Sequence, residues 1–372
     1  MRSSISSTSG SAPPADAAGR AGSRIWQTAL GLGISVVALY FALRGIPLGV
    51  IGREIAHANP WWYALSVVLA TLTFPIRTMR WRIMLERSAG QAALRPVWQA
   101  TAIGFMANNI LPARGGELAR AYVASRLVPV RFATALGSLA VERVFDGLIL
   151  ILLLAAAIAD SGFSSTATIG GRSVAQIATW TGALFVLVLG VLFAVVHAPT
   201  GALALAGRAL RKVLPARAAD ALVGLARHFI AGLSILRAPR DFGLVVVWSF
   251  VLWLVNGVAF YTGFLAFHLQ GPPLEGALAT AGTALPLTAA LLLQGVVAIG
   301  VSIPSSPGFF GLFEVASRAG LGLYGVGAAS AVSFAVGIHL GWFIPITVIG
   351  LWTLARAHLS LGDLRGGSGE ER

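Results

Sequence analysis

Three short polar motifs interrupt the long apolar runs of this chain, and the first of them has the residue types of an anion site. It holds Asn108, Asn109, Pro112, Arg114, Gly115, Gly116, Glu117 and Arg120. Glycines let the backbone approach a ligand closely, and a helix that starts near them directs free N–H groups at a phosphate. Arg114 and Arg120 are expected to clamp phosphate oxygens, while Glu117 holds an arginine or recognises a cationic head group. The alternative is a cytoplasmic helix–turn whose arginines only set membrane topology.

The second motif is Glu142, Arg143 and Asp146, directly before an unbroken apolar run. On a helix the two acids lie one turn apart, and Arg143 pairs with Asp146 at a spacing of three residues. An ionisable side chain at the centre of a bilayer costs about 2.5 to 3.5 kcal/mol, so these groups are expected to face the protein interior. Membership of a binding site and an ion pair that only locks helices together both remain open.

The third motif holds Pro304, Ser306, Pro307, Gly308, Gly311 and Glu314. Ser306 followed by Pro307 is a helix-start signature, since the hydroxyl caps the helix and proline suits its first position. We expect this half-helix to point its N-terminus at the same cavity as the first motif, with a simple Pro–Gly turn as the alternative.

Two further groups are ambiguous. Arg77 and Arg80 end a predicted span, where they are either phosphate anchors at the membrane interface or ordinary topology anchors. His339, in the last apolar block, is expected to be a hydrogen-bonded packing residue rather than a proton relay.

Composition determines which elements must carry these motifs. The 372 residues are 56% hydrophobic and only 11% charged, which is too apolar for an ordinary soluble chain. The net charge of +13 comes almost entirely from arginine and fits the positive-inside rule and anionic lipid. No basic arm or zinc pattern indicates nucleic acid, and no metal or cofactor motif is visible. The lack of cysteine excludes disulfides, thiolate metal sites and cysteine nucleophiles.

The apolar pattern predicts an all-α, polytopic transmembrane bundle of about 6 to 8 spans with two broken, re-entrant hairpins. The hairpins contain the first and third motifs, and weak similarity between them leaves an inverted repeat open. Single spans are expected at 25–43, 61–81, 133–157, 175–196 and 242–267, while 326–354 allows one tilted span or two short helices. The predicted organisation is a disordered cytoplasmic tail (1–23), one transmembrane domain (24–357) with a cytoplasmic basic amphipathic segment (197–241), and a short polar tail (358–372).

The three motifs, in this order and spacing, resemble the lysylphosphatidylglycerol synthase transmembrane (flippase-like) family over about residues 25–357. In its namesake the membrane region moves an aminoacylated phosphatidylglycerol, which a separate cytoplasmic domain makes. That aminoacyl-transferring domain is expected to be absent here. The resemblance implies a multi-pass protein of the bacterial inner (cytoplasmic) membrane with a cytoplasmic N-terminus.

The leading functional hypothesis is therefore translocation of an anionic, zwitterionic, aminoacylated or glycosylated lipid, without a catalytic residue, metal or cofactor. The expected partners are membrane lipids and, as one option, a lipid-modifying enzyme; nucleic acid is not expected. Two alternatives remain: a membrane-embedded enzyme acting on a lipid phosphate, and a non-catalytic membrane subunit of a lipid-modifying system. Against an enzyme, no histidine is close in sequence to either broken hairpin's motif.

Overall fold

The architecture comes from a computed structural model, which describes residues 30–111, 115–160, 168–169, 172–232, 238–269, 285–303 and 306–360. The described chain is helical except for β1 (Thr168–Ile169) and β2 (Arg172–Ser173), which form one short antiparallel pair. The predicted all-α class is confirmed. The predicted terminal tails fall mostly outside the described residues.

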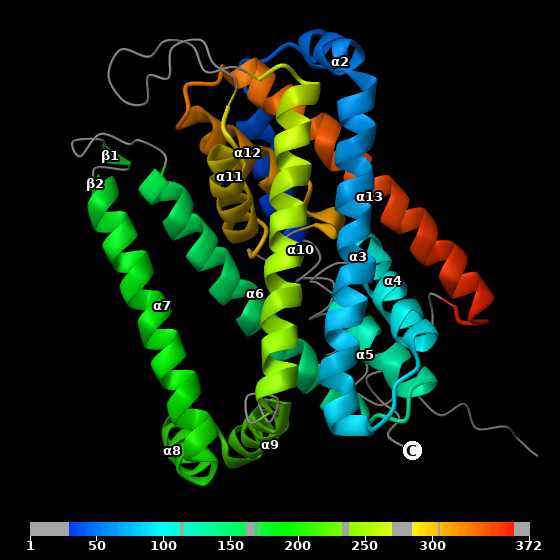
Figure 1. Ribbon diagram of the computed structural model, residues 1–372, viewed down its shortest axis with the longest axis vertical. Coiled ribbons are helices and arrows are strands. Elements are labelled where there is room, and N and C mark those ends of the chain that lie inside the picture. Colours follow the sequence, from blue (N-terminus) through cyan, green and yellow to red (C-terminus); the bar gives the residue numbers. More distant parts are fainter. Residues whose placement is uncertain are drawn as a thin grey trace, which may run out of the picture.

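Long helices form the frame of the bundle. They are α3 (Pro60–Ala89), α6 (Phe132–Asp160), α7 (Val174–His197), α10 (Pro239–Ala266) and α13 (Ala328–Arg356). The α3 helix begins where the Asn59 side chain accepts from the N–H groups of Trp61 and Trp62, with proline at its first position. It runs along α10 for much of its length (Figure 1).

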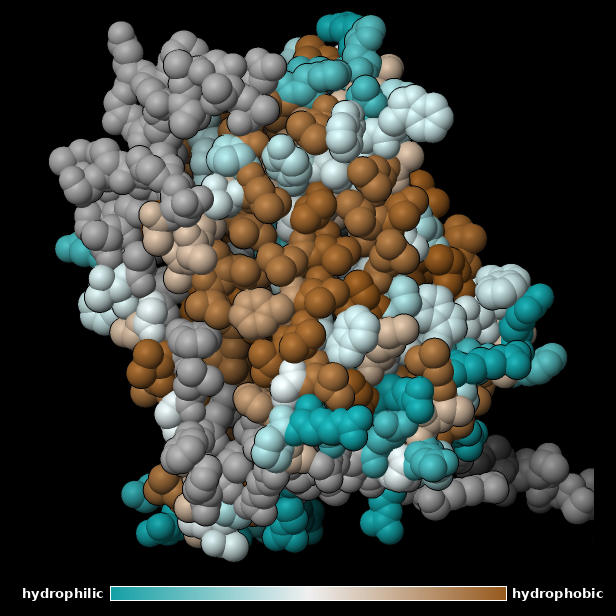
Figure 2. Space-filling view, in the orientation of Figure 1, coloured by the Kyte–Doolittle hydropathy of each residue, from teal (hydrophilic) through white to brown (hydrophobic). Residues whose placement is uncertain are grey.

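Two of the described helices, α10 and α13, are long and apolar enough by themselves to cross a membrane. A third span results if the helix Leu30–Leu43 and α2 (Leu48–His57), which are bent by 77°, are counted together. Of the two options for the last apolar block, the structure has one continuous helix. On the face shown in Figure 2, apolar residues form a belt across the middle of the molecule, with polar residues above and below it. The protein is a multi-pass membrane protein.

Both predicted broken hairpins are present. The first consists of α4 (Leu94–Ile110) and α5 (Gly115–Leu127), and the second of α11 (Leu287–Gly300), the short helix η2 (Pro307–Phe309) and α12 (Leu312–Gly322). They lie in opposite halves of the bundle (Figure 1). The α4 helix contacts both α13 and η2, so the broken ends of the two hairpins are neighbours.

The basic segment predicted to lie on the membrane surface forms α8 (Pro199–Val213) and α9 (Ala216–Gly232), at the lower end of the bundle in Figure 1. Both helices have one apolar and one polar face. Arg211 and Asp220 form an exposed ion pair of 3.0 Å between them. The position of this segment on the cytoplasmic surface of the membrane stays a prediction.

The α4 and α5 helices pack unusually closely because glycines face each other. A Cβ atom on Gly116 would lie 2.1 Å from the carbonyl oxygen of Gly104, and one on Gly104 would lie 2.5 Å from Cβ of Arg120. Small residues at such contacts let helix backbones approach in membrane proteins. The approach places Arg120 against α4.

Candidate functional site

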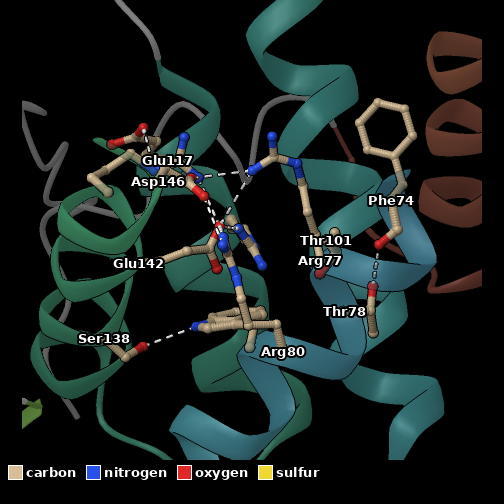
Figure 3. A network of polar contacts seen from close by, with 12 residues as sticks. Phe74, Arg77, Thr78, Arg80, Thr101, Glu117, Ser138, Glu142 and Asp146 are labelled. Atoms are coloured by element: carbon tan, nitrogen blue, oxygen red, sulfur yellow. Dashed lines mark hydrogen bonds and ion pairs between the residues drawn. The ribbon is translucent and has the colours of Figure 1, made fainter. Parts of the chain in front are cut away.

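A buried ion network joins four helices near the broken end of the first hairpin (Figure 3). Asp146 on α6 is its first centre. Its carboxylate accepts from Arg80 Nη1 at 2.7 Å and from Arg77 Nη1 at 3.3 Å, and it forms an ion pair of 3.2 Å with Arg143 Nη2. The indole of Trp253 on α10 donates to the same carboxylate at 3.1 Å. Asp146 is 4% exposed, so these bonds form away from water.

Glu142, one turn earlier on α6, is the second centre and is fully buried. Its Oε1 atom lies 2.7 Å from Arg143 Nη2, 3.0 Å from Arg120 Nη1 and 3.2 Å from Arg80 Nη2. Its Oε2 atom has no hydrogen-bond partner among the described residues. The predicted proximity of Glu142, Arg143 and Asp146 is confirmed, and the structure adds guanidinium groups from α3 and α5.

Arg77 and Arg80 do not lie at an exposed membrane interface, where the sequence suggested phosphate or topology anchors. They are 9% and 0% exposed. The reason is the length of α3, which continues to Ala89 and so places both arginines inside the bundle. There, Arg80 also donates to Ser249 Oγ on α10 at 2.9 Å.

A small cleft, open to the surface, lies beside this network. Residues of α4, α5 and α6 line it: Gly104, Phe105, Asn108, Gly116, Glu117, Arg120, Leu139 and Arg143. Arg143 and Glu117 have side chains 39% and 38% exposed and lie 3.9 Å apart, so they form the rim. Arg120 is almost completely buried at the inner wall.

Arg120 is fixed in position, but its contacts with described residues use only part of its hydrogen-bonding groups. Its guanidinium lies 4.0 Å above the ring of Trp81, and Trp81 is itself fixed by a bond of 2.9 Å from its indole to Ser138. Only Nη1 is paired with Glu142, while Nε and Nη2 are buried without a hydrogen-bond partner among the described residues. Buried guanidinium N–H groups without acceptors are costly unless an acceptor from outside binds them.

The network also carries excess positive charge. Arg77, Arg80, Arg120 and Arg143 face only two buried carboxylates, those of Glu142 and Asp146, which leaves two positive charges. Counting Glu117 at the rim leaves one. An anion in the cleft would neutralise this excess where the surroundings screen charge poorly.

The start of α5 lies beside the cleft. The Asn108 side chain at the end of α4 accepts from the backbone N–H of Gly116 at 2.9 Å, so the tip of one helix caps the next. Glu117 in the first turn suits the positive end of the helix dipole. Gly115 begins the helix, whereas Pro112 and Arg114 lie outside the described residues.

Residues of the third motif lie elsewhere. Glu314 is buried against His339, and no residue of this motif lines the described cleft. The expectation that both motifs face one cavity is therefore not met by the described cleft. Pro304 lies outside the described residues, while Ser306 bonds to Ser35 on the helix Leu30–Leu43 with Oγ atoms 2.7 Å apart. Asn109, on α4, bonds to Thr347 on α13 at 2.8 Å rather than lining the cleft.

Sequence reasoning missed several supporting residues. Ser249 and Trp253 bind the network from α10, and Trp81 and Ser138 position Arg120. A serine or tryptophan in an apolar span gives no distinctive sequence signal, because both residue types also occur there for packing. Only their spatial neighbours show what they bind.

Comparison with known proteins gives a family match and similar curated proteins. Residues 28–350 match the family model described as "Lysylphosphatidylglycerol synthase TM region". The chain is 28% identical over 322 residues to Glycosyltransferase AglD of Haloferax volcanii, an alignment that covers 77% of this chain and 47% of that protein. It is also 28% identical over 125 residues to a UPF0104 membrane protein of Methanocaldococcus jannaschii, covering 33% of this chain and 37% of the relative. The chain thus spans about half the length, or less, of these curated relatives.

Proposed function

Because the chain belongs to the lysylphosphatidylglycerol synthase transmembrane family, we propose that it binds the phosphate of an anionic membrane lipid in the cleft between α4, α5 and α6 and moves that head group across the bilayer. The acyl chains remain in the surrounding lipid, against the apolar belt of the bundle. The proposed setting is the cytoplasmic membrane, with a cytoplasmic N-terminus.

The observation that carries the proposal is the state of Arg120. Its guanidinium is buried at the inner wall of the cleft and stacked on Trp81, and its Nε and Nη2 groups have no acceptor within the described part of the chain. A planar fork of donors matches the oxygens of a phosphodiester. Arg143 at the rim gives an entering phosphate its first cationic contact, and Glu117 beside it offers a carboxylate to any amino group on the same head group.

A second candidate is a lipid that carries a phosphate-linked sugar. It follows from the similarity to Glycosyltransferase AglD, a protein named for sugar transfer. The phosphate would occupy the same cleft, so the two candidates differ only in what the phosphate bears. Mass spectrometry of lipids that copurify with the protein distinguishes them, because it identifies the head group directly.

Lipid movement in proteoliposomes tests the proposal. Fluorescent phosphatidylglycerol, quenched by dithionite in the outer leaflet, should change leaflet faster with the protein than in empty vesicles. Arg143→Gln should slow this movement by tenfold or more, since losing one charged contact to phosphate costs about 1.4 kcal/mol or more. A fluorescent glucosylceramide, which lacks phosphate, should not be moved.

Arg126→Gln is the matched control, because Arg126 is an exposed arginine on α5 that does not line the cleft. This variant should move phosphatidylglycerol at the unaltered rate. The proposal fails if both variants move it equally well, or if the phosphate-free lipid moves as fast as phosphatidylglycerol.

A further inference from the structure

A buried acid–histidine pair joins the second hairpin to α13 and takes no part in the cleft. Glu314 on α12 is 2% exposed and His339 on α13 is 7% exposed. Glu314 Oε1 lies 2.6 Å from His339 Nδ1, and His339 Nε2 lies 2.9 Å from the carbonyl oxygen of Gly308 in η2. The other carboxylate oxygen accepts from the backbone N–H of Gly311 at 2.6 Å. The pair therefore ties the irregular turn between η2 and α12 to α13.

The backbone of that turn needs these ties. Gly308 and Gly311 have φ angles of +71° and +89°, and Phe309 between them has φ of +62°, which is unfavourable for a residue with a Cβ atom. Non-helical backbone within a membrane protein must bond to protein groups or to enclosed water. Here the carboxylate of Glu314 accepts from the backbone N–H of Gly311, and one ring nitrogen of His339 bonds to the carbonyl oxygen of Gly308.

The protons of the pair follow from the chemistry of these partners. A carbonyl oxygen only accepts, so Nε2 of His339 must carry hydrogen to bond with Gly308. The contact between Nδ1 and Glu314 then requires one more proton, which lies on either atom. The observed arrangement thus holds two exchangeable protons and is neutral overall, as imidazolium with carboxylate or as imidazole with carboxylic acid.

Removing one proton cannot leave both contacts intact. If Nε2 keeps its hydrogen, lone pairs face each other between Nδ1 and Glu314; if Nδ1 keeps it, Nε2 faces Gly308 without a hydrogen. Either way, the turn loses one tie to α13, and a negative charge remains buried. The number of protons on the pair is therefore linked to the position of the hairpin.

We propose that Glu314 and His339 form a proton-binding site in the membrane domain, and that loss of their shared proton releases the second hairpin from α13. The imidazole packs against the rings of Phe310 and Phe313, whose centroids lie 4.6 and 4.4 Å away, and these contacts help to hold it in place. No metal or nucleotide is needed for such a site, only access of protons.

Other ionisable groups on the packed elements do not pair with this site among the described residues. The η2 helix and α11 carry none. The remaining packed elements, α2 and α3 among them, contribute the following described groups: Tyr40, Arg53, Glu54, His57, Tyr63, Arg77, Arg80, Arg82, Glu86, Arg95, Arg240, Asp241, Tyr261, Arg318 and Arg356. Arg318, one turn after Glu314, donates instead to the carbonyl oxygens of Phe41 and Ala42. The charge at this site therefore changes only with the number of protons on Glu314 and His339.

A short chain of contacts joins the site to the lipid cleft. Asn108, which caps α5 at the cleft, is followed by Asn109, whose amide donates to Phe343 O at 3.4 Å and to Thr347 Oγ1 on α13. The Phe343 ring in turn contacts Phe310 and His339. Coupling of the proton to lipid movement rests on the proposed function, whereas the proton site itself does not.

The chain has no cysteine, so spin labels can be attached at two introduced cysteines. Ile303→Cys places one label on the second hairpin, just after α11, and Leu351→Cys places the other on α13. Both positions are exposed. The distance between labels is measured in lipid nanodiscs from about pH 5 to about pH 10, a range that brackets the ordinary pKa of imidazole. Nitrogen-15 NMR of histidine follows protonation in parallel. We expect a single short distance while His339 is protonated and loss of that population once it deprotonates.

Glu314→Gln is the decisive variant because it keeps every hydrogen bond. The amide oxygen accepts from Gly311 and the amide NH2 donates to a neutral Nδ1, so Nε2–H still bonds to Gly308. The short distance should then persist at all pH values with His339 neutral. His339→Phe keeps the ring stacking, loses both bonds and should lack the short distance throughout.

A wild-type distance that stays constant over the whole range would overturn the proposal, as would Glu314→Gln with the pH response of the wild type. Neither measurement uses lipid transport, so either can fail or succeed independently of the vesicle assay. If the site holds, an imposed pH gradient should change the rate of phosphatidylglycerol movement by the wild type and leave that of Glu314→Gln unaltered.

Discussion

Replacing Asp146 by alanine is expected to lower the free energy of unfolding by about 3 to 5 kcal/mol, the range for removing one partner of a buried ion pair. The carboxylate accepts from two guanidinium groups and from the Trp253 indole, and it forms an ion pair with a third guanidinium, that of Arg143. Without it, the arginines of α3 and α6 repel one another inside the bundle. Reversible unfolding in mixed detergent micelles, followed by tryptophan fluorescence, measures the change.

Asp220→Ala provides the comparison, because Asp220 also pairs with an arginine but has a side chain 60% exposed. Exposed pairs contribute about 0.2 to 1 kcal/mol, so this variant should unfold nearly as the wild type does. If both variants lost the same free energy of unfolding, burial would not explain the contribution of Asp146 to stability, and the prediction would be wrong.

Gly116→Ala is expected to separate α4 from α5 and to destabilise the protein by about 1 to 3 kcal/mol or more, the usual cost of overpacking. The new methyl group would lie 2.1 Å from Gly104 O and 2.4 Å from Asn108 Oδ1, so backbone has to move. The Asn108 cap on α5 would be lost with it. The unfolding measurement used for Asp146→Ala detects the loss of stability.

Gly243→Ala is the matched control. Gly243 lies within α10, and nothing stands within 4 Å of the Cβ atom that alanine would add. Alanine is a better helix former than glycine by about 0.8 to 1 kcal/mol, so this variant should be as stable as the wild type or more so. If Gly116→Ala behaves like Gly243→Ala, the close approach of α4 and α5 does not constrain that position.

The sequence carries strong signals for the class of fold and for its breaks. Long apolar runs require membrane helices, and Pro112 with Gly115 and Gly116 cannot continue a straight helix, so the first hairpin follows from local chemistry. The grouping of Glu142, Arg143 and Asp146 follows equally from helical spacing. These features depend on neighbours in the chain.

The sequence does not show how deeply a polar or charged residue is buried in the bundle. Arg77 and Arg80 follow an apolar run, which is where arginines at a membrane surface also stand, and only the continuation of α3 to Ala89 places them in the interior. His339 is separated from Glu314 by 25 positions along the chain, so their contact of 2.6 Å is set by how α12 packs on α13. The sequence therefore predicts a hydrogen-bonded packing residue at His339, but it does not show that the partner is Glu314.

Glu142 has a consequence for how tightly the proposed cleft can hold an anion. Its Oε1 atom accepts from Arg120 Nη1 and Arg143 Nη2 and lies 3.2 Å from Arg80 Nη2, so it pairs with the guanidinium groups that a phosphate would seek. A lipid entering the cleft must therefore compete with an internal carboxylate for the positive charge of the same arginines. On the proposed function, that competition weakens binding and gives the arginines another acceptor when the lipid leaves. A carrier needs this exchange, since a ligand held without a rival would stay bound and end the cycle.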